Sequence, residues 1–220
     1  MKTRGKQPVE QRVEAFFSAY PKRSYPAGQI LVFANENPEY IFYLADGKVR
    51  KYDVSYRGDE VVVNIFKSGA FFPMSWAINR SPNHYFYKTE TASSVHIVPT
   101  EAALQFIKND PEVMFDLLSR IYRGMDGLLG RLVHLMSGSA KSRLLYELII
   151  ECRRFGEENP DGSYSLKINE GDLAARTGLS RETVSREIRK IKTDNLVKLD
   201  GKSIQISNLA GLEEKIGSVI

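Results

Sequence analysis

Cysteine is almost absent from this sequence, which contains a single one, Cys152, among 220 residues. One thiol excludes a disulfide within the chain, and it excludes a zinc or iron–sulfur site built from several cysteine ligands. Cys152 follows the apolar run 144–150, which has helical spacing. We therefore expect a buried, unreactive thiol rather than a redox switch.

Histidine and long apolar runs are also scarce. The three histidines, His84, His96 and His134, are far apart and form no short metal-ligand motif. The sequence accordingly predicts no metal site, no cofactor, no catalytic residues and no enzyme activity. No segment has the apolar length of a membrane span, and the first residues, MKTRGKQPVEQ, lack the apolar core of a signal peptide. We expect a cytoplasmic protein without a membrane partner.

Length and composition allow a two-domain protein, and the net charge is compatible with a polyanionic partner. A chain of 220 residues, 42% hydrophobic and 26% charged, suffices for two modest cores. The net charge of +4 is compatible with nucleic acid. Basic residues that would neutralise phosphates are concentrated in one stretch: Arg176, Arg181, Arg186, Arg189, Lys190 and Lys192.

That stretch, residues 169–192, has the pattern of two short helices joined by a tight turn at Gly178. Leu173, Ala174 and Thr177 form an inward stripe on the first helix, and the second has its own: Val184, Ile188 and Ile191. Ser180 occupies an N-cap position, and the polar face behind it carries Arg181, Glu182, Ser185, Arg186, Arg189 and Lys192. Such a helix can enter a major groove, where Arg reads guanine and Glu accepts from cytosine.

A hairpin is predicted directly after this motif, with alternating apolar residues over 196–206 and a turn at Asp200-Gly201. A helix-turn-helix followed by a hairpin is a winged helix. One alternative is a surface helical hairpin with a solvated charged face. Another is a ligand-binding or enzymatic β-barrel protein whose winged helix mediates protein contacts.

The run GLSRETVSREIRKIKTDNLVKL resembles the DNA-binding domain of the Crp/Fnr superfamily of bacterial transcription regulators. Arg181, Glu182 and Arg186 fall on base-reading positions of that family's R-E-T-V-x-R signature. The resemblance implies recognition of a DNA half-site similar to TGTGA. Ser185 matches the oxygen-responsive branch of the family rather than the cyclic-AMP branch, so only the central GA step of the half-site is inferred. With one cysteine, the chain cannot use a cysteine-ligated cluster to sense oxygen.

The N-terminal half is expected to form a jelly-roll-like β-roll. A short amphipathic helix spans 8–20, and six short β-rich runs follow between 24 and 98, separated by turns such as Asp46-Gly47. The resemblance implies a cyclic-nucleotide-binding-like sensory domain. However, Pro73-Met74 and Asn83-His84 replace the residues that hold ribose and phosphate in that family, so cyclic AMP is not expected.

Apolar and aromatic residues stand where the nucleotide contacts would be. A candidate pocket for a small, uncharged or aromatic effector comprises Phe71, Phe72, Met74, Trp76, Tyr85, Tyr87 and, from the long helix described next, Leu128. Alternatively, these aromatic side chains fill the barrel core, or the protein binds DNA without any effector.

A long helix is predicted from the N-cap Asp110 to about Ser137. Its heptad stripe suits a partner helix: Met114, Leu118, Ile121, Met125, Leu128, Leu132 and Leu135. The stripe could instead pack on the chain's own barrel. Gly124, Gly127 and Gly130 either permit close helix approach or soften the helix.

These features predict an α+β protein with three parts: a sensory β-roll over 1–109, a dimerisation helix and hinge over 110–138, and a winged helix-turn-helix domain over 139–220. The expected function is a Crp/Fnr-type regulator that binds a palindrome in double-stranded DNA as a homodimer. RNA polymerase is a further expected partner if the protein is an activator. Effector control would act across Gly138.

Overall fold

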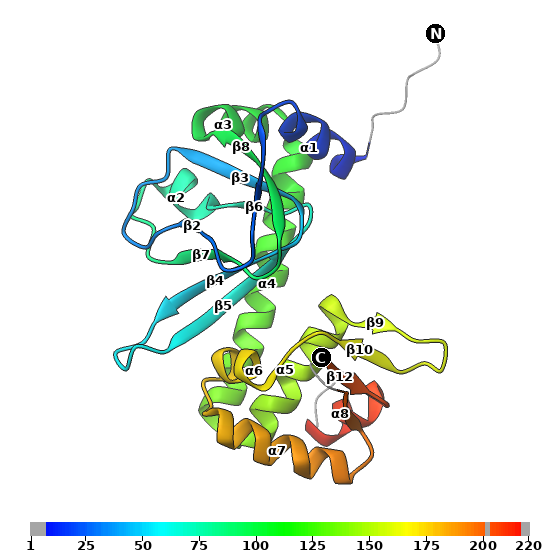
Figure 1. The fold of residues 1–220 in the computed structure, drawn as a ribbon. Coiled ribbons are helices and arrows are strands. Elements are labelled where there is room, and N and C mark those ends of the chain that lie inside the picture. The colour runs from blue at the N-terminus through cyan, green and yellow to red at the C-terminus, as the bar shows by residue number, and fades with distance from the viewer. Residues whose placement is uncertain (1–7, 201–202, 217–220) are drawn as a thin grey trace. The chain divides into compact units, whose positions relative to one another are not determined.

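The computed structural model describes residues 8–200 and 203–216. It is an α+β structure with an N-terminal β-sheet unit, a long helix and a C-terminal helix-turn-helix unit, as the sequence predicts (Figure 1). The division between two compact units falls between Ile121 and Tyr122, inside the long helix. Gly201, part of the predicted hairpin turn, and the N-terminal residues 1–7 lie outside the described range. No helix within that range has the length and hydropathy of a membrane span.

The first unit contains two antiparallel sheets of four strands each. The strands are β1 (Lys22–Tyr25), β2 (Ile30–Val32), β3 (Tyr40–Asp46), β4 (Lys48–Val54), β5 (Glu60–Lys67), β6 (Phe71–Phe72), β7 (Phe86–Thr89) and β8 (Ser93–Pro99). One sheet has the order β1-β8-β3-β6 and the other β2-β7-β4-β5. The six predicted strands are present, while β1 and the two-residue β6 are additional.

Alternation along these strands separates two apolar clusters. In β3, Ile41 and Tyr43 belong to a cluster with the helices, whereas Leu44 belongs to a cluster that draws residues from both sheets. Phe71 and Phe72 divide in the same way. Successive side chains of a strand point to opposite faces, so the first sheet packs on helices with one face and on the other sheet with its second face.

Three short helices accompany the sheets: α1 (Val9–Ser18), α2 (Met74–Asn79) and α3 (Thr100–Asn109). Only α1 is predicted by the sequence. Val13 and Phe17 of α1 are buried in the helix-facing cluster. Asp110 then begins the long helix by accepting a hydrogen bond from the Glu112 amide at 3.1 Å, and its carboxylate also pairs with Arg12 at 2.8 Å. An N-cap and an ion pair thus fix the start of the long helix against α1.

The long helix, α4 (Pro111–Ser137), leaves its apolar stripe uncovered within one chain. The seven predicted stripe residues, Met114 to Leu135, are each 43–51% exposed. Leu117, beside the stripe, packs against the helix-facing cluster. Met114, Leu118 and Ile121 belong to the same unit as the barrel and are 44–45% exposed, so this part of the stripe does not pack on it.

The second unit is built around α5 (Ala140–Phe155), which buries eight side chains. The other elements are β9 (Glu157–Glu158), β10 (Tyr164–Leu166), α6 (Glu170–Thr177), α7 (Arg181–Thr193), β11 (Val197–Asp200), β12 (Ser203–Ile206) and α8 (Leu209–Ile216). The strands form one antiparallel sheet with the order β11-β12-β10-β9. The segment 155–161, predicted as a loop, therefore includes the edge strand β9.

Several contacts join the C-terminal part of α4 to α5. A Cβ at Gly130 would overlap the phenol of Tyr146, whose hydroxyl donates to the Gly127 carbonyl at 3.3 Å. Arg131 forms two hydrogen bonds with the buried Glu147, at 2.8 and 2.9 Å. Arg143 donates to the Leu135 carbonyl at 3.1 Å. These contacts join residues on the two sides of Gly138, the predicted domain boundary. They hold the end of α4 and α5 together around that glycine.

Substitution of two helical glycines by alanine should have opposite effects. At Gly124 an added Cβ meets no atom within 4 Å, so Gly124→Ala should stabilise α4 by about 0.5–1 kcal/mol. At Gly130 the Cβ overlaps Tyr146, which is 4% exposed, and Gly130→Ala should destabilise by about 1–3 kcal/mol. Urea unfolding followed by circular dichroism measures both. A destabilising Gly124→Ala would instead show that a second copy packs closely at Gly124.

Candidate nucleic-acid interface

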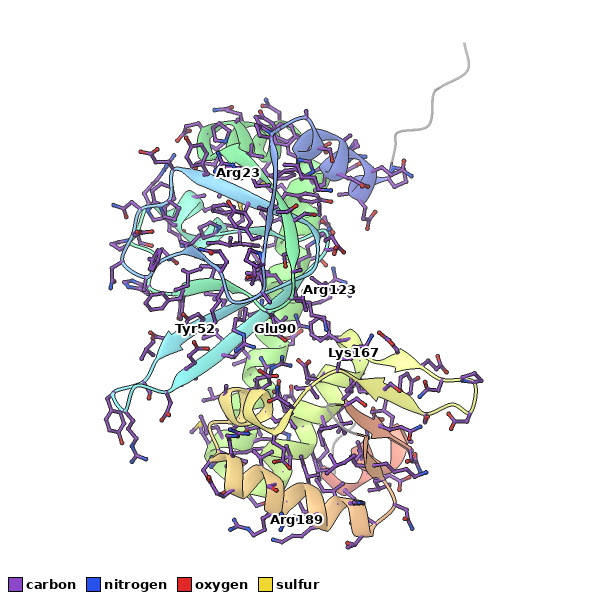
Figure 2. The ribbon with its side chains drawn as sticks, in the orientation of Figure 1. Arg23, Tyr52, Glu90, Arg123, Lys167 and Arg189 are labelled. Atoms are coloured by element: carbon purple, nitrogen blue, oxygen red, sulfur yellow. The ribbon has the colours of Figure 1, made fainter. Side chains whose placement is uncertain are left out.

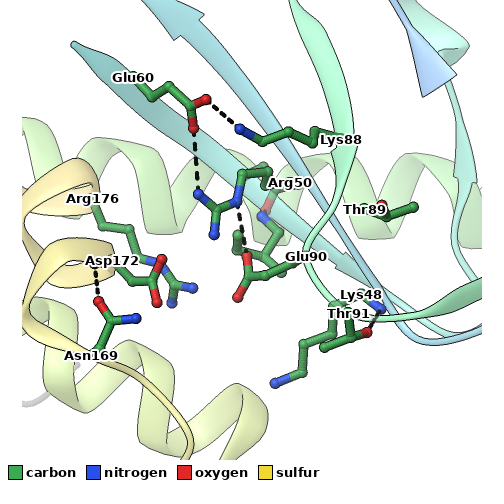
Figure 3. A network of polar contacts seen from close by, with 12 residues as sticks. Lys48, Arg50, Glu60, Lys88, Thr89, Glu90, Thr91, Asn169, Asp172 and Arg176 are labelled. Atoms are coloured by element: carbon green, nitrogen blue, oxygen red, sulfur yellow. Dashed lines mark hydrogen bonds and ion pairs between the residues drawn. The ribbon is translucent and has the colours of Figure 1, made fainter. Parts of the chain in front are cut away.

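The first helix of the motif, α6, has a defined beginning and end. The Asn169 side chain accepts from the Asp172 amide at 2.9 Å (Figure 3), which is an N-cap. The helix ends at Gly178, whose φ of 67° is left-handed and strained for other residues. Leu173 and Thr177 are buried, as the inward stripe predicts. This turn sets the direction in which the second helix leaves.

The second helix, α7, begins at the predicted cap. Ser180 accepts a hydrogen bond from the Thr183 amide at 3.2 Å. Val184, Ile188 and Ile191 are fully buried in the apolar core of the unit. One side of α7 is therefore fixed by packing, and the polar side of its first turns is left accessible.

The exposed face of α7 is rich in cations. Of the predicted contact residues, Ser185 is half-buried and the others are exposed: Ser180, Arg181, Glu182, Arg186, Arg189 and Lys192. Arg189, labelled in Figure 2, lies on the outer side of the helix. Among residues 8–200 and 203–216, Arg189 and Lys192 form no ion pair with a carboxylate, and Arg181 interacts only with the charge of the adjacent Glu182. Their charges are available to phosphates.

Two carboxylates of α7 differ in their surroundings. The pKa of Glu182 is lowered, first by its own backbone amide and then by the Ser180 hydroxyl, so this exposed group is an ionised acceptor at neutral pH. Glu187 is 5% exposed and accepts from Lys190 at 2.8 Å. The burial of Glu187 is not predicted by its charge.

Arg176 departs from the expectation that it neutralises phosphate. It is 8% exposed and forms an ion pair with Glu151 of α5. Desolvation raises the pKa of Glu151, and the Arg176 charge opposes that rise. Arg176 therefore holds α6 on α5. Helical spacing predicts the inward position of Arg176, because residues 173, 176 and 177 lie on one face of the helix.

The aromatic residues proposed as an effector pocket do not come together as one set. Phe71, Met74 and Trp76 belong to the helix-facing cluster, whereas Phe72, Tyr85 and Tyr87 belong to the cluster between the sheets. The rings of Phe72 and Tyr87 stack with centroids 5.1 Å apart. Leu128 lies in the second unit, 43% exposed. The stacked core supports the interpretation that most of these residues are structural.

The positions that would hold a cyclic nucleotide are otherwise occupied. Asn83 is 2% exposed, and its amide donates to the carbonyls of Phe33 at 3.0 Å and Tyr85 at 2.6 Å. Arg80, from the nearby Arg-Ser pair, is exposed and forms an ion pair with Glu101. Neither provides a buried guanidinium for a phosphate.

Sequence reasoning did not identify the polar residues of β4. Arg50 pairs with Glu60 at 3.5 Å and Glu90 at 3.4 Å (Figure 3). Lys51 instead lies 3.9 Å from the centre of the Tyr85 ring, and burial lowers its pKa. Its cross-strand neighbour is the buried Tyr87. In the described ranges, no group of three His, Cys, Asp or Glu side chains is arranged to hold a metal.

Comparison with known proteins gives two family matches. Residues 22–110 match the cyclic nucleotide-binding domain and residues 142–215 the Crp-like helix-turn-helix domain. The cAMP-activated global transcriptional regulator CRP of Haemophilus influenzae is 24% identical over 184 residues, covering 83% of this chain and 82% of that protein. A global nitrogen regulator of Synechocystis is 25% identical over 199 residues, covering 87% of each.

A solved structure has the same fold. A CRP/FNR-family transcriptional regulator from Thermus thermophilus superposes with a TM-score of 0.73 at 23% identity, covering 90% of this chain and 99% of that one. The fold, the capped helix-turn-helix and these relatives, which are regulators rather than enzymes, define a transcription regulator with a helix-turn-helix DNA-binding domain. The chain belongs to the Crp/Fnr superfamily.

The ion pair between Arg176 and Glu151 gives a stability prediction. Arg176→Met leaves the Glu151 carboxylate buried without its partner and should lower the free energy of unfolding by about 3–5 kcal/mol. The double variant Glu151→Leu/Arg176→Met should lose less, because no charge is stranded. Urea titration at pH 7 measures both. Equal losses would mean that the ion pair does not determine the packing of α6.

The same single variant should depend on pH. Burial raises the folded-state pKa of Glu151 above its ordinary 4.5, and loss of Arg176 raises it further. The folded state then binds a proton that the unfolded state releases, so stability falls as pH rises above about 4.5. Arg176→Met should therefore be closer to wild type at pH 5 than at pH 7.

Proposed function

We propose that this regulator binds a palindromic DNA site as a homodimer, with the N-terminal turns of α7 in the major groove. The observation that carries the proposal is the two-sided character of α7: Val184, Ile188 and Ile191 are buried, while Arg181, Glu182 and Arg186 are exposed behind a formed N-cap. Arg186 would read guanine by two hydrogen bonds, and Glu182 would accept from cytosine N4. Arg189 and Lys192 would contact phosphates.

The uncovered stripe on α4 supports the dimer. Seven apolar residues at heptad spacing remain 43–51% exposed in one chain, and a helix with such a stripe is stabilised by a second helix. A two-fold dimer would present two copies of α7 to half-sites about 34 Å apart. RNA polymerase is a further partner if the protein activates transcription.

We propose that a small effector, if one binds, is not a cyclic nucleotide. The burial of Asn83 and the surface ion pair of Arg80 support this. Such an effector would meet the half-buried Lys51 and Tyr85 of the β-roll, because Phe72 and Tyr87 are only 1% and 2% exposed. Because α4 and α5 are joined through Tyr146 and Arg131, the effector would act on α4 upstream of these contacts rather than at Gly138.

Substitutions on α7 should separate base reading from phosphate contact. Arg186→Ala should cost about 1–3 kcal/mol on the preferred site and relax preference at one base pair. Lys192→Ala should weaken binding evenly across sequences and reduce the salt slope by about one. Selection from a random duplex library, followed by anisotropy at several salt concentrations with and without cyclic AMP, measures these effects.

Enrichment of a palindrome with GA-containing half-sites is the expected result for the wild-type protein. If Arg186→Ala kept the wild-type sequence preference, the proposed placement of α7 in the major groove would be wrong. Absence of DNA binding at any salt concentration, with and without cyclic AMP, would favour the alternative in which the winged helix contacts another protein.

Charge on the α4 stripe should abolish the dimer. Leu118→Glu/Leu132→Glu places carboxylates on the stripe, where pairing would bury them, so light scattering should give a mass near the 24.9 kDa of one chain. Asp126→Lys, on the same helix but outside the stripe, is the control and should remain dimeric. A monomeric wild-type protein would overturn the proposed dimer.

A further inference from the structure

Glu187 occupies a core position on the helix proposed to read DNA. Residues 184, 187, 188 and 191 lie on one face of α7, and three of them are Val184, Ile188 and Ile191, all fully buried. The Glu187 side chain is 6% exposed. An apolar residue would satisfy the packing there, and a carboxylate carries a desolvation penalty. Packing alone does not account for an acid at this position.

Both partners of this carboxylate are exposed cations of α7 that belong to the basic residues expected to neutralise phosphates. One oxygen accepts from Lys190 Nζ at 2.8 Å, and the same oxygen lies 3.4 Å from Arg186 Nε. Lys190 and Arg186 are 57% and 62% exposed. The hydrogen bond from Lys190, with a smaller contribution from Arg186, lowers the pKa of Glu187, so the group is ionised at neutral pH.

The geometry points to Glu187 as a specificity-determining residue, an inference that rests on the proposed function. Its carboxylate competes with DNA for Arg186 and Lys190. A phosphate contact, available on any sequence, must displace Glu187 and replaces one ionic contact with another. Guanine offers Arg186 two directed hydrogen bonds. The correct base therefore compensates for the lost Arg186–Glu187 contact better than a phosphate does. Glu187 thereby weakens non-specific binding more than specific binding.

The test is Glu187→Gln in the full chain, which removes the charge and keeps the size. Anisotropy is measured on the duplex selected by the wild-type protein and on a scrambled duplex of equal length. Affinity for the scrambled duplex should rise by about two- to fivefold, and affinity for the selected duplex should rise less. The ratio of the two affinities therefore falls. The salt slope on the scrambled duplex should steepen by about one.

A matched control removes the same charge elsewhere in the unit. Glu213 of α8 pairs with Arg153 at 2.8 Å, and Glu213→Gln should leave the affinity ratio unchanged. Circular dichroism shows whether each variant is folded. If Glu187→Gln does not fold, Glu187→Asp replaces it, because the shorter side chain keeps the charge but withdraws from Lys190.

The outcomes separate the two proposals. If the wild-type protein does not distinguish the duplexes, the proposed function fails. If it distinguishes them but the folded Glu187 variant keeps the wild-type ratio, or changes it no more than Glu213→Gln does, the inference about Glu187 is wrong.

Discussion

The second unit depends on the burial of α5 together with the two carboxylates that it carries inside. Glu147 and Glu151 are 1% and 4% exposed, one turn apart on the same face. Each carries a charge that is tolerable in the interior only with a partner, and Arg131 and Arg176 supply one each. The first pair attaches the end of α4, and the second attaches α6. An α5 with apolar residues in place of Glu147 and Glu151 could also be buried. It would not specify that α4 lies on one turn of α5 and α6 on the next.

The sequence predicts apolar helical faces more reliably than the charged residues that share them. The stripes of α6 and α7, their caps and the turn at Gly178 could be assigned from spacing, because those features depend on neighbouring residues alone. Arg176 is expected among the phosphate-neutralising cations because of its residue type, although its register with Leu173 places it inward. Glu187 has the same inward register relative to Val184. A charged residue at a core position needs a partner, which is buried for Arg176 and exposed for Glu187. The identity of that partner, Glu151 for Arg176, depends on tertiary packing and could not be derived from the sequence.

The β-roll shows the same limit in a different form. Six strands could be predicted from alternation and turns, whereas β1, β6 and α2 are too short to show a period. Helix α3 has helical spacing, with Ala103, Leu104 and Ile107 buried, and could have been predicted from it. Successive side chains of a strand point to opposite faces of the sheet, so the neighbouring aromatic residues Phe71 and Phe72 must lie on different sides. A single pocket lined by both was therefore excluded by strand geometry. Lys51 beneath Tyr85 could not be anticipated, since its neighbour comes from a distant segment.

Cys152 provides a chemical reporter for the second unit. Its thiol is 2% exposed in the core of α5, and burial raises its pKa to about 11, so alkylating reagents will meet neither the sulfur nor its thiolate while the core is closed. Because the chain has no other cysteine, the rate of alkylation in native buffer measures how often this core opens. Measured with and without a DNA duplex, that rate would report, without a fluorescent label, how much a bound duplex stabilises the winged helix.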